Sequence, residues 1–259
     1  MVHTNSRFGL TWFVILSSFF IDSCCHTANE KQIHSMLISA DSDKGIFILG
    51  GIHQAHEKAS LYTYQRMGDI YRHLQPEVLA VECEQKFIED KTYKGMPYDF
   101  RRYMVPAAVK DRIPIYGIDW WDEQSGKEWQ QLQERAGNDK KLKPEIALFE
   151  GLFGLLDEYF LVKDFQEINA EEITSLWAAK SEFKYNVFSR HQEYRRISEY
   201  EDMRNRHILE NIVAVAHKHP TAKILVAIGI DHKYFLERAL REKGLRVFPV
   251  NEVIKKWWR

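Results

Sequence analysis

Two apolar runs in this sequence end in the same pattern, a glycine followed three positions later by a histidine. Gly50-x-x-His53 closes the first run and Gly229-x-x-His232 closes the second. Continuous apolar runs of this kind are typical of fully buried strands, and glycines at their ends permit tight turns and close backbone approach. One such pattern alone has little value. Its repetition predicts that both histidines belong to one functional site.

A carboxylate joins this pair, because Glu82 ends another apolar run, 77–82. Ligands collect beyond the carboxyl ends of parallel strands, so we expect His53, Glu82 and His232 to converge there. Two imidazoles and a carboxylate suit a divalent metal with open positions for water and substrate. Such a metal would acidify the water and polarise a carbonyl. Without a metal, the same three side chains could act as general base, general acid and orienting group.

Four other side chains could assist this chemistry, and each also has a structural interpretation. His56 could be a ligand, support the ligands or begin a helix. Asp231 could orient an imidazole or cap the following helix. Asp119, at the end of a strand, could support the site, contact substrate or cap a helix. Arg204, on a long helix, could pair with an oxyanion or carboxylate, or lie on a solvated face.

The pattern of elements predicts an α/β fold, a central sheet with helices on both faces built from a duplicated β-α-β unit, plus a helical insertion. The units cover 45–82 and 222–250, and the insertion covers about 123–190, which is charged and nearly free of strand signals. The first crossover is expected to be right-handed. Other helices are expected over 57–75, 99–110, 193–219 and 232–242, and other strands over 113–119 and 245–250. Pro106 is expected to kink or interrupt its helix.

Composition excludes several classes of protein. A chain of 259 residues with 45% hydrophobic content can build one large domain, here 45–259. The formal charge of −1 and the lack of a basic stripe argue against nucleic-acid binding. Cys83 is the one cysteine of this domain, which excludes an intramolecular disulfide framework. No lipase-type serine motif, His-Glu-x-x-His, Walker loop or dinucleotide fingerprint is found.

The first 25 residues differ from the rest. The uncharged stretch 8–21 is too short to span a bilayer comfortably and has the length of a signal-peptide core. The residues before Cys24 are similar to a bacterial lipoprotein signal, although Asp22 departs from it. We expect export, with 1–25 as leader, 26–44 as tether, lipidation at Cys24 and a periplasmic or cell-surface location at the membrane. An uncleaved anchor or ordinary signal cleavage are the alternatives.

Four segments together resemble the TraB/PrgY, GumN and TIKI-like proteins, within a wider superfamily that includes erythromycin esterase and the haem-binding ChaN lipoproteins. The matching segments are the two glycine-histidine strands 47–53 and 226–232, the strand 76–82, and the helix carrying Arg204-Asn205. The resemblance implies an α/β fold from a duplicated unit. It places His53, Glu82 and His232 at the family's two histidines and glutamate, with Arg204 and Asn205 beside them.

The resemblance leaves three functions open. TIKI-like members are described as metal-dependent proteases, and erythromycin esterases as hydrolases that use His and Glu. The first implied function is therefore a hydrolase of amide or ester bonds in a peptide or small molecule. Its metal would be Mn, Co, Fe or Zn. ChaN-like members imply a lipoprotein that binds haem or another ligand. The third function is a non-catalytic signalling or peptide-binding module. Gly51 and Asp231 replace residues common in relatives and leave the substrate and metal open.

Overall fold

The computed structural model describes residues 44–121 and 123–255. The predicted leader, the lipidation site Cys24 and all but the last residue of the predicted tether lie outside these residues. Within the described ranges, no helix has both the length and the apolar character needed to cross a membrane.

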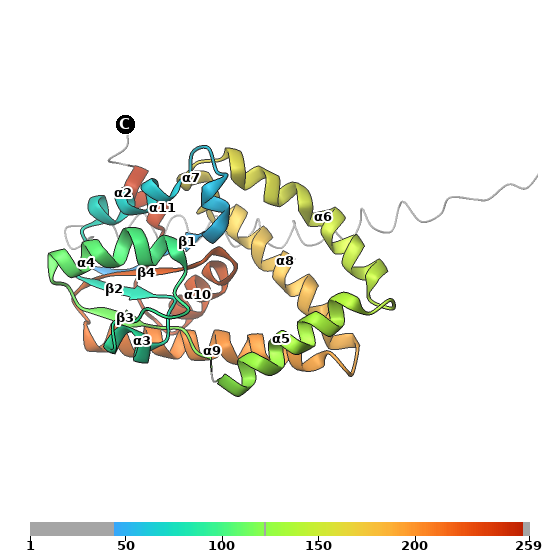
Figure 1. Cartoon of the computed structure of the whole chain (residues 1–259). Coiled ribbons are helices and arrows are strands. Elements are labelled where there is room, and N and C mark those ends of the chain that lie inside the picture. Colours follow the sequence, from blue (N-terminus) through green and yellow to red (C-terminus); the bar gives the residue numbers. More distant parts are fainter. Residues whose placement is uncertain (1–43, 122, 256–259) are drawn as a thin grey trace, which may run out of the picture. The chain divides into compact units, whose positions relative to one another are not determined.

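A five-stranded parallel sheet lies at the centre of the described residues (Figure 1). Its strand order is β3-β2-β4-β1-β5, with β1 (Gly45–Gly51), β2 (Val78–Val81), β3 (Ile115–Gly117), β4 (Lys223–Gly229) and β5 (Val247–Phe248). The strands β1 and β4 pair along their whole length, from Gly45 beside Lys223 to Gly51 beside Gly229. The two glycine-histidine runs therefore end side by side, at one edge of the sheet.

The two predicted β-α-β units interleave. In the first unit, the chain leaves β1, forms α2 (Tyr64–Leu74) and returns as β2, with β4 lying between the two strands. In the second, it leaves β4, forms α10 (Ile230–Glu242) and returns as β5, with β1 between them. Each unit thus supplies a central strand to the other, which explains why the ends of β1 and β4 are neighbours.

Helices cover both faces of the sheet, which confirms the predicted fold class. Phe47 and Leu49 of β1 point to the face covered by α2, α4 (Val105–Asp111) and α11 (Val250–Lys255). Ile46 and Ile48 point to the opposite face, which α9 (Arg195–Lys218) and α10 cover. This alternation follows from the two-residue period of a strand. Because both faces are covered, the strands read as continuous apolar runs.

The remaining helices include α3 (Gln85–Glu89) and the short π-helix η2 (Phe100–Met104), which precedes α4. Between β3 and α9 lie α5 (Glu123–Asn138), α6 (Lys143–Val162), α7 (Phe165–Ile168) and α8 (Glu171–Arg190). In Figure 1, α5, α6 and α8 extend away from the sheet. The short α7 instead packs against the sheet, because Phe165 and Ile168 are buried in the same cluster as β1.

Two segments differ from the sequence-based expectation, and one agrees with it. The helix predicted from residue 57 begins only at Tyr64, after the 3₁₀ helix η1 (His53–Glu57), because Tyr62 and His56 are buried and bond to the end of β1. Pro106 lies in the first turn of α4, and the change from the π-helix η2 to α4 directly before it agrees with the predicted interruption of the helix. The strand predicted over 245–250 is confined to β5, and α11 begins at Val250.

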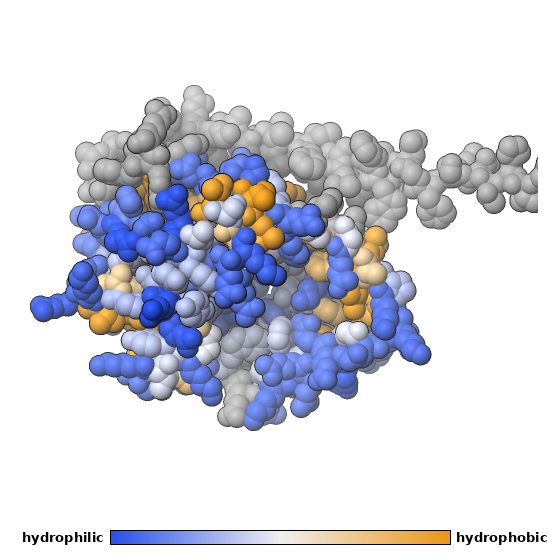
Figure 2. All heavy atoms as spheres, turned by 45° about the horizontal axis from the view of Figure 1, so that its top comes forward, coloured by the Kyte–Doolittle hydropathy of each residue, from blue (hydrophilic) through white to orange (hydrophobic). Residues whose placement is uncertain are grey.

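Apolar side chains also reach the surface in places. On the face shown in Figure 2 they form separate areas among mostly hydrophilic residues. Among the residues that the structure describes, the large apolar side chains that are at least half exposed are those of Leu61, Val109, Leu148 and Val162. Scattered exposure of this kind is normal for a folded surface and identifies no partner.

Adjacent positions on α10 test this core. Leu236 is fully buried against the sheet, whereas Phe235 is 38% exposed. We expect Leu236→Ala to lower the free energy of unfolding by about 2–5 kcal/mol, because it removes buried methyl groups and leaves a cavity. We expect Phe235→Ala to cost less than about 1 kcal/mol. Urea denaturation of both variants measures this, and equal losses would contradict the described packing.

Candidate active site

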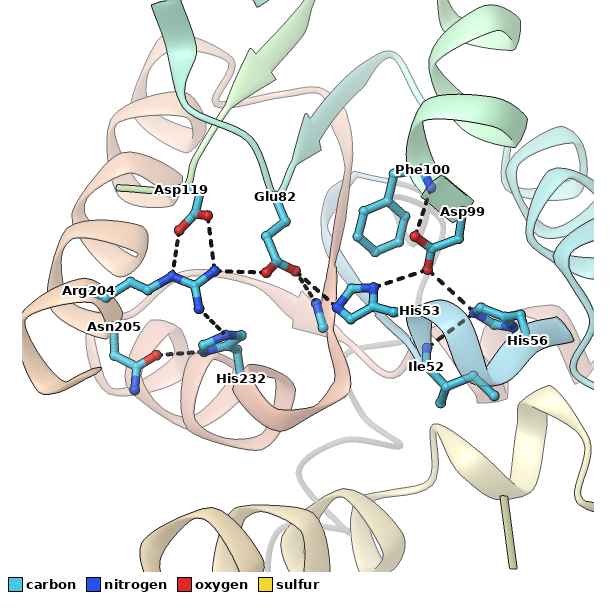
Figure 3. A network of polar contacts seen from close by, with 11 residues as sticks. Ile52, His53, His56, Glu82, Asp99, Phe100, Asp119, Arg204, Asn205 and His232 are labelled. Carbon is cyan, nitrogen blue, oxygen red and sulfur yellow. Dashed lines mark hydrogen bonds and ion pairs between the residues drawn. The ribbon is translucent and has the colours of Figure 1, made fainter. Parts of the chain in front are cut away.

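Glu82 stands at the centre of the polar network at the carboxyl edge of the sheet (Figure 3). It follows β2, and its backbone N–H continues the ladder by donating to Ala227 O at 3.0 Å. Its Oε1 accepts from Arg204 Nη2 at 2.8 Å and its Oε2 from the Gly229 N–H at 2.6 Å. The side chain is only 9% exposed, so these contacts replace the water that would otherwise surround a carboxylate.

His53 is the more exposed partner of Glu82, with 38% of its side chain accessible. Its Nε2 lies 3.6 Å from Glu82 Oε2, and its Nδ1 donates to Asp99 Oδ2 at 3.3 Å. His53 also has a φ of +47°, in the left-handed region that residues with a side chain rarely adopt. Such strain occurs most often at functional sites, where the surrounding structure enforces it.

Asp99 is a member of the network that the sequence did not indicate. It is fully buried, and its Oδ1 accepts from the Phe100 N–H at 3.1 Å where η2 begins. Its Oδ2 faces His53 Nδ1 and, at 3.5 Å, His56 Nε2. In the sequence Asp99 is a plausible first residue of a helix, and nothing in its spacing connects it to His53. The available signal was a carboxylate at a helix start, which is too common to be diagnostic.

Arg204 connects Glu82 with His232. From α9, its Nε and Nη2 donate to the two carboxylate oxygens of Asp119 at 2.8 and 3.0 Å. Its Nη2 also donates to Glu82 Oε1, and its Nη1 to His232 Nε2 at 3.4 Å. The ring of Trp121 lies 5.1 Å from the guanidinium carbon. Arg204 is therefore held by carboxylates and an aromatic ring, and in turn it positions Glu82 and His232.

His232 lies in the first turn of α10 and is almost fully buried. Its Nδ1 donates to Asn205 Oδ1 at 2.6 Å, which leaves Nε2 as the acceptor that faces Arg204. Burial, followed by the charge of Arg204, lowers the pKa of His232 to about 4. His232 is therefore a neutral imidazole at neutral pH, and its tautomer is set by Asn205.

The other predicted residues have distinct places. His56 is buried in η1, where its ring contacts the backbone as well as Asp99. Asp231 is in the first turn of α10, where the helix dipole favours a carboxylate. Within the described residues it makes no hydrogen bond to either imidazole, although its charge contributes to raising the pKa of His53. The network thus brings together all the predicted side chains except that of Asp231.

Gly229 of the second motif and Gly51, which follows the glycine of the first, make room for this network. A Cβ on Gly229 would lie 2.8 Å from His53 Nε2 and 3.3 Å from Glu82 Oε2. A Cβ on Gly51 would lie 2.7 Å from Asp99 Oδ2. Real Cβ atoms essentially never approach within 3.0 Å, so the positions of His53 and Asp99 require that Gly229 and Gly51 lack a side chain.

The charges of His53 and Glu82 support one another. Partial burial favours the neutral imidazole, but the hydrogen bond to Asp99 and the charges of Glu82 and Asp99 raise the pKa of His53 to about 9. Burial would raise the pKa of Glu82, but the charges of His53 and Arg204 lower it to about 2. Asp99 is also buried, but its hydrogen bond to His53 and the charge of that imidazole hold its pKa below the usual range. At neutral pH the site therefore contains an imidazolium between two carboxylates.

This arrangement bears on the predicted metal. Across residues 44–121 and 123–255, no group of three or more His, Cys, Asp or Glu side chains is placed to hold a metal ion. The guanidinium of Arg204 contacts both Glu82 and His232, and a second cation beside it would be repelled. His53, Glu82 and His232 as arranged here do not fit a divalent ion. Metal binding by this chain stays a prediction.

The fold and site define an α/β protein with a buried carboxylate, imidazole and guanidinium cluster. No protein-family model matches the chain. Lecithin-cholesterol acyltransferase-like 1 of Arabidopsis thaliana is 28% identical over 109 residues, which are 42% of this chain and 23% of that protein. The chain thus matches less than a quarter of that relative's length. A mutant erythromycin esterase in its open conformation aligns with a TM-score of 0.33 and 10% identity, covering 76% of this chain and 63% of the other. Neither similarity assigns an activity to the chain.

The left-handed backbone of His53 can be tested with two truncations. His53→Ala and His53→Gly both remove the imidazole, but only glycine relieves the strain of a positive φ. We therefore expect the glycine variant to be more stable than the alanine variant by at least about 0.5 kcal/mol. Thermal and urea unfolding of both proteins measure the difference. An alanine variant as stable as the glycine variant would contradict the described backbone.

The two histidines should also respond oppositely to pH. An unfolded histidine has a pKa of about 6.5. Because folding raises the pKa of His53, its stabilisation is complete below about pH 6.5 and is lost as the pH rises towards 9. Because folding lowers the pKa of His232, the folded state loses stability as the pH falls from about 6.5 towards 4.

We therefore expect the stability of the wild type relative to His53→Ala to decline from pH 6.5 to 8.5. Its stability relative to His232→Ala should decline from pH 6.5 to 5. Urea unfolding at each pH provides the measurement. The variant His217→Ala, at an exposed position of α9, is the control and should follow the wild type. Parallel curves for all four proteins would rule out this assignment of charges.

Proposed function

We propose that this protein is a hydrolase of ester or amide bonds in which His53 and Glu82 transfer the protons. The observation that supports this most strongly is the Asp99–His53–Glu82 array, in which a partly exposed, strained imidazole lies between two buried carboxylates. A carboxylate that orients a histidine through Nδ1 is a recurrent device of hydrolytic catalysis. The other nitrogen, Nε2, then faces Glu82 and the place where substrate would enter.

The protonated His53 suits the role of general acid. As water attacks the acyl carbon, Nε2 gives its proton to the leaving oxygen or nitrogen, and the bond between the acyl carbon and that atom breaks. Glu82 accepts the proton lost by the attacking water. That proton then returns from Glu82 Oε2 to His53 Nε2, which are 3.6 Å apart. Contacts of this kind are often long before substrate binds and shorten in the complex.

The electrostatic coupling between His53 and Glu82 supports this exchange of protons. The charge of His53 is the largest interaction that lowers the pKa of Glu82. When His53 gives up its proton, that charge disappears and Glu82 becomes more basic. The same step that consumes the acid therefore strengthens the base.

Arg204 has a positioning role in this proposal. Of the roles that the sequence left open, Arg204 pairs with carboxylates, because its N–H groups are directed to Asp119, Glu82 and His232. It fixes the Glu82 carboxylate so that Oε2 faces His53. The partial similarity to an acyltransferase-like protein is in keeping with acyl chemistry, since acyl transfer and hydrolysis break the same type of bond.

Replacement of the acid tests the proposal. We expect His53→Gln to lower kcat/KM by about 100-fold or more, because glutamine cannot supply the proton. The assay is a panel of chromogenic esters with short to long acyl groups, together with peptide amides. The control His217→Ala removes an exposed histidine and should retain full activity. Turnover by the wild type that persists in His53→Gln would remove His53 from the mechanism.

The predicted metal is tested on the same proteins. Elemental analysis by mass spectrometry after loading with manganese, cobalt, zinc or iron measures binding, and the assay is repeated after chelation. The proposal expects activity to survive chelation. It also expects the wild type, His53→Gln and His232→Ala to contain the same amount of metal, because the site holds none. Activity that disappears on chelation and returns with one metal would replace it with a metal-dependent mechanism.

A further inference from the structure

The edge of β1 that leads to His53 is completed by side chains instead of a strand. The Ile46 N–H points towards β5, where it donates to Arg246 O at 2.9 Å. Backbone groups alternate along a strand, so the N–H groups of Gly50 and Ile52 point to the same side. However, β5 pairs with β1 at Ile46 and Phe47 and then ends.

Two buried side chains take the place of the missing strand. Asn169, just after α7, accepts from the Gly50 N–H through Oδ1 at 2.8 Å, and its Nδ2 lies 3.4 Å from Gly50 O. His56 accepts from the Ile52 N–H through Nε2 at 3.1 Å and donates from Nδ1 to Tyr62 O at 2.6 Å. The amide of Asn169 thus offers the same donor and acceptor as the backbone of a neighbouring strand.

The surroundings of Asn169 fit its amide closely. Asn169 is fully buried, and a Cβ on Gly50 would lie 3.2 Å from its Oδ1, so a larger residue there would crowd the bond. The ring of Tyr62 closes the same space, with its OH donating to Gly50 O at 2.8 Å. A buried amide with its hydrogen bonds satisfied is a rigid element. His53 follows Gly50 by three residues and is held there in its strained conformation.

We propose that Asn169 is a positioning residue through which the helical segment 123–190 controls the geometry of His53. The segment reaches the edge of β1 at this corner, because α7 packs against the sheet and Asn169 directly follows it. The inference rests on the proposed function where it concerns turnover. Its structural part, the control of the β1 edge, stands independently.

Hydrogen–deuterium exchange measured by NMR tests the structural part. In Asn169→Ala we expect the Gly50 amide to exchange at least about 10-fold faster, and Ile52 to follow, while Val226 in the central strand β4 is unchanged. The imidazole resonances of His53 should shift. The control Asn186→Ala, at an exposed position of α8, should leave all of these unchanged. Unchanged exchange at Gly50 would overturn the proposal.

Turnover on the best substrate of the ester and amide panel tests the catalytic part. A misplaced His53 should lower kcat by about 10-fold to 100-fold while KM stays within a few-fold. A shift of the His53 resonances in folded Asn169→Ala distinguishes this role from general destabilisation, which would leave the folded molecules unchanged. If Asn169→Ala does not fold, Asn169→Ser, whose side chain is too short to reach Gly50, serves instead.

Fast exchange at Gly50 with unchanged kcat would also overturn the proposal. If the wild type hydrolyses nothing, the proposed function fails, and exchange and the His53 resonances alone decide this inference.

Discussion

The buried carboxylate of Glu82 is the constraint on which the site depends. A charge taken from water into the edge of a sheet is costly unless other groups replace its hydration. Arg204, the Gly229 N–H and His53 supply that replacement, each from a different element. Those elements must therefore meet at one point, which is where the interleaved strands β2, β4 and β1 end. The arrangement of the strands therefore provides the groups that stabilise the charge of Glu82.

His53 combines a strained backbone with a positive charge, because contacts from several parts of the fold fix its position. Asp99 bonds its Nδ1, Glu82 attracts its Nε2, and the preceding edge of β1 is locked by Asn169 and His56. A left-handed histidine costs on the order of 1–3 kcal/mol, and it persists only where its surroundings determine the conformation. Such a residue is preorganised, since it needs no rearrangement before it meets a substrate.

The sequence carried the fold and much of the site. Continuous apolar runs identified the buried strands, and the repeated glycine-histidine ends, with Glu82, placed three side chains at one edge of a parallel sheet. The strands and the position of these side chains could be predicted because each depends on a local pattern in the sequence. The start of α2 and the length of β5 were not predictable, because they are decided by the burial of Tyr62 and His56 and by the chain turning into α11.

What the sequence determined by itself is the set of strands, the edge at which their polar residues gather, and the need for glycine beside them. Tertiary structure alone decided which groups contact one another. Asp99 reaches His53 and Asn169 reaches Gly50 across 46 and 119 positions of sequence, without any periodic signal. The placement of Arg204 between Glu82 and His232 likewise follows from how α9 packs on the sheet. Charge balance within a site is a property of distances in space, and residue order does not record those distances.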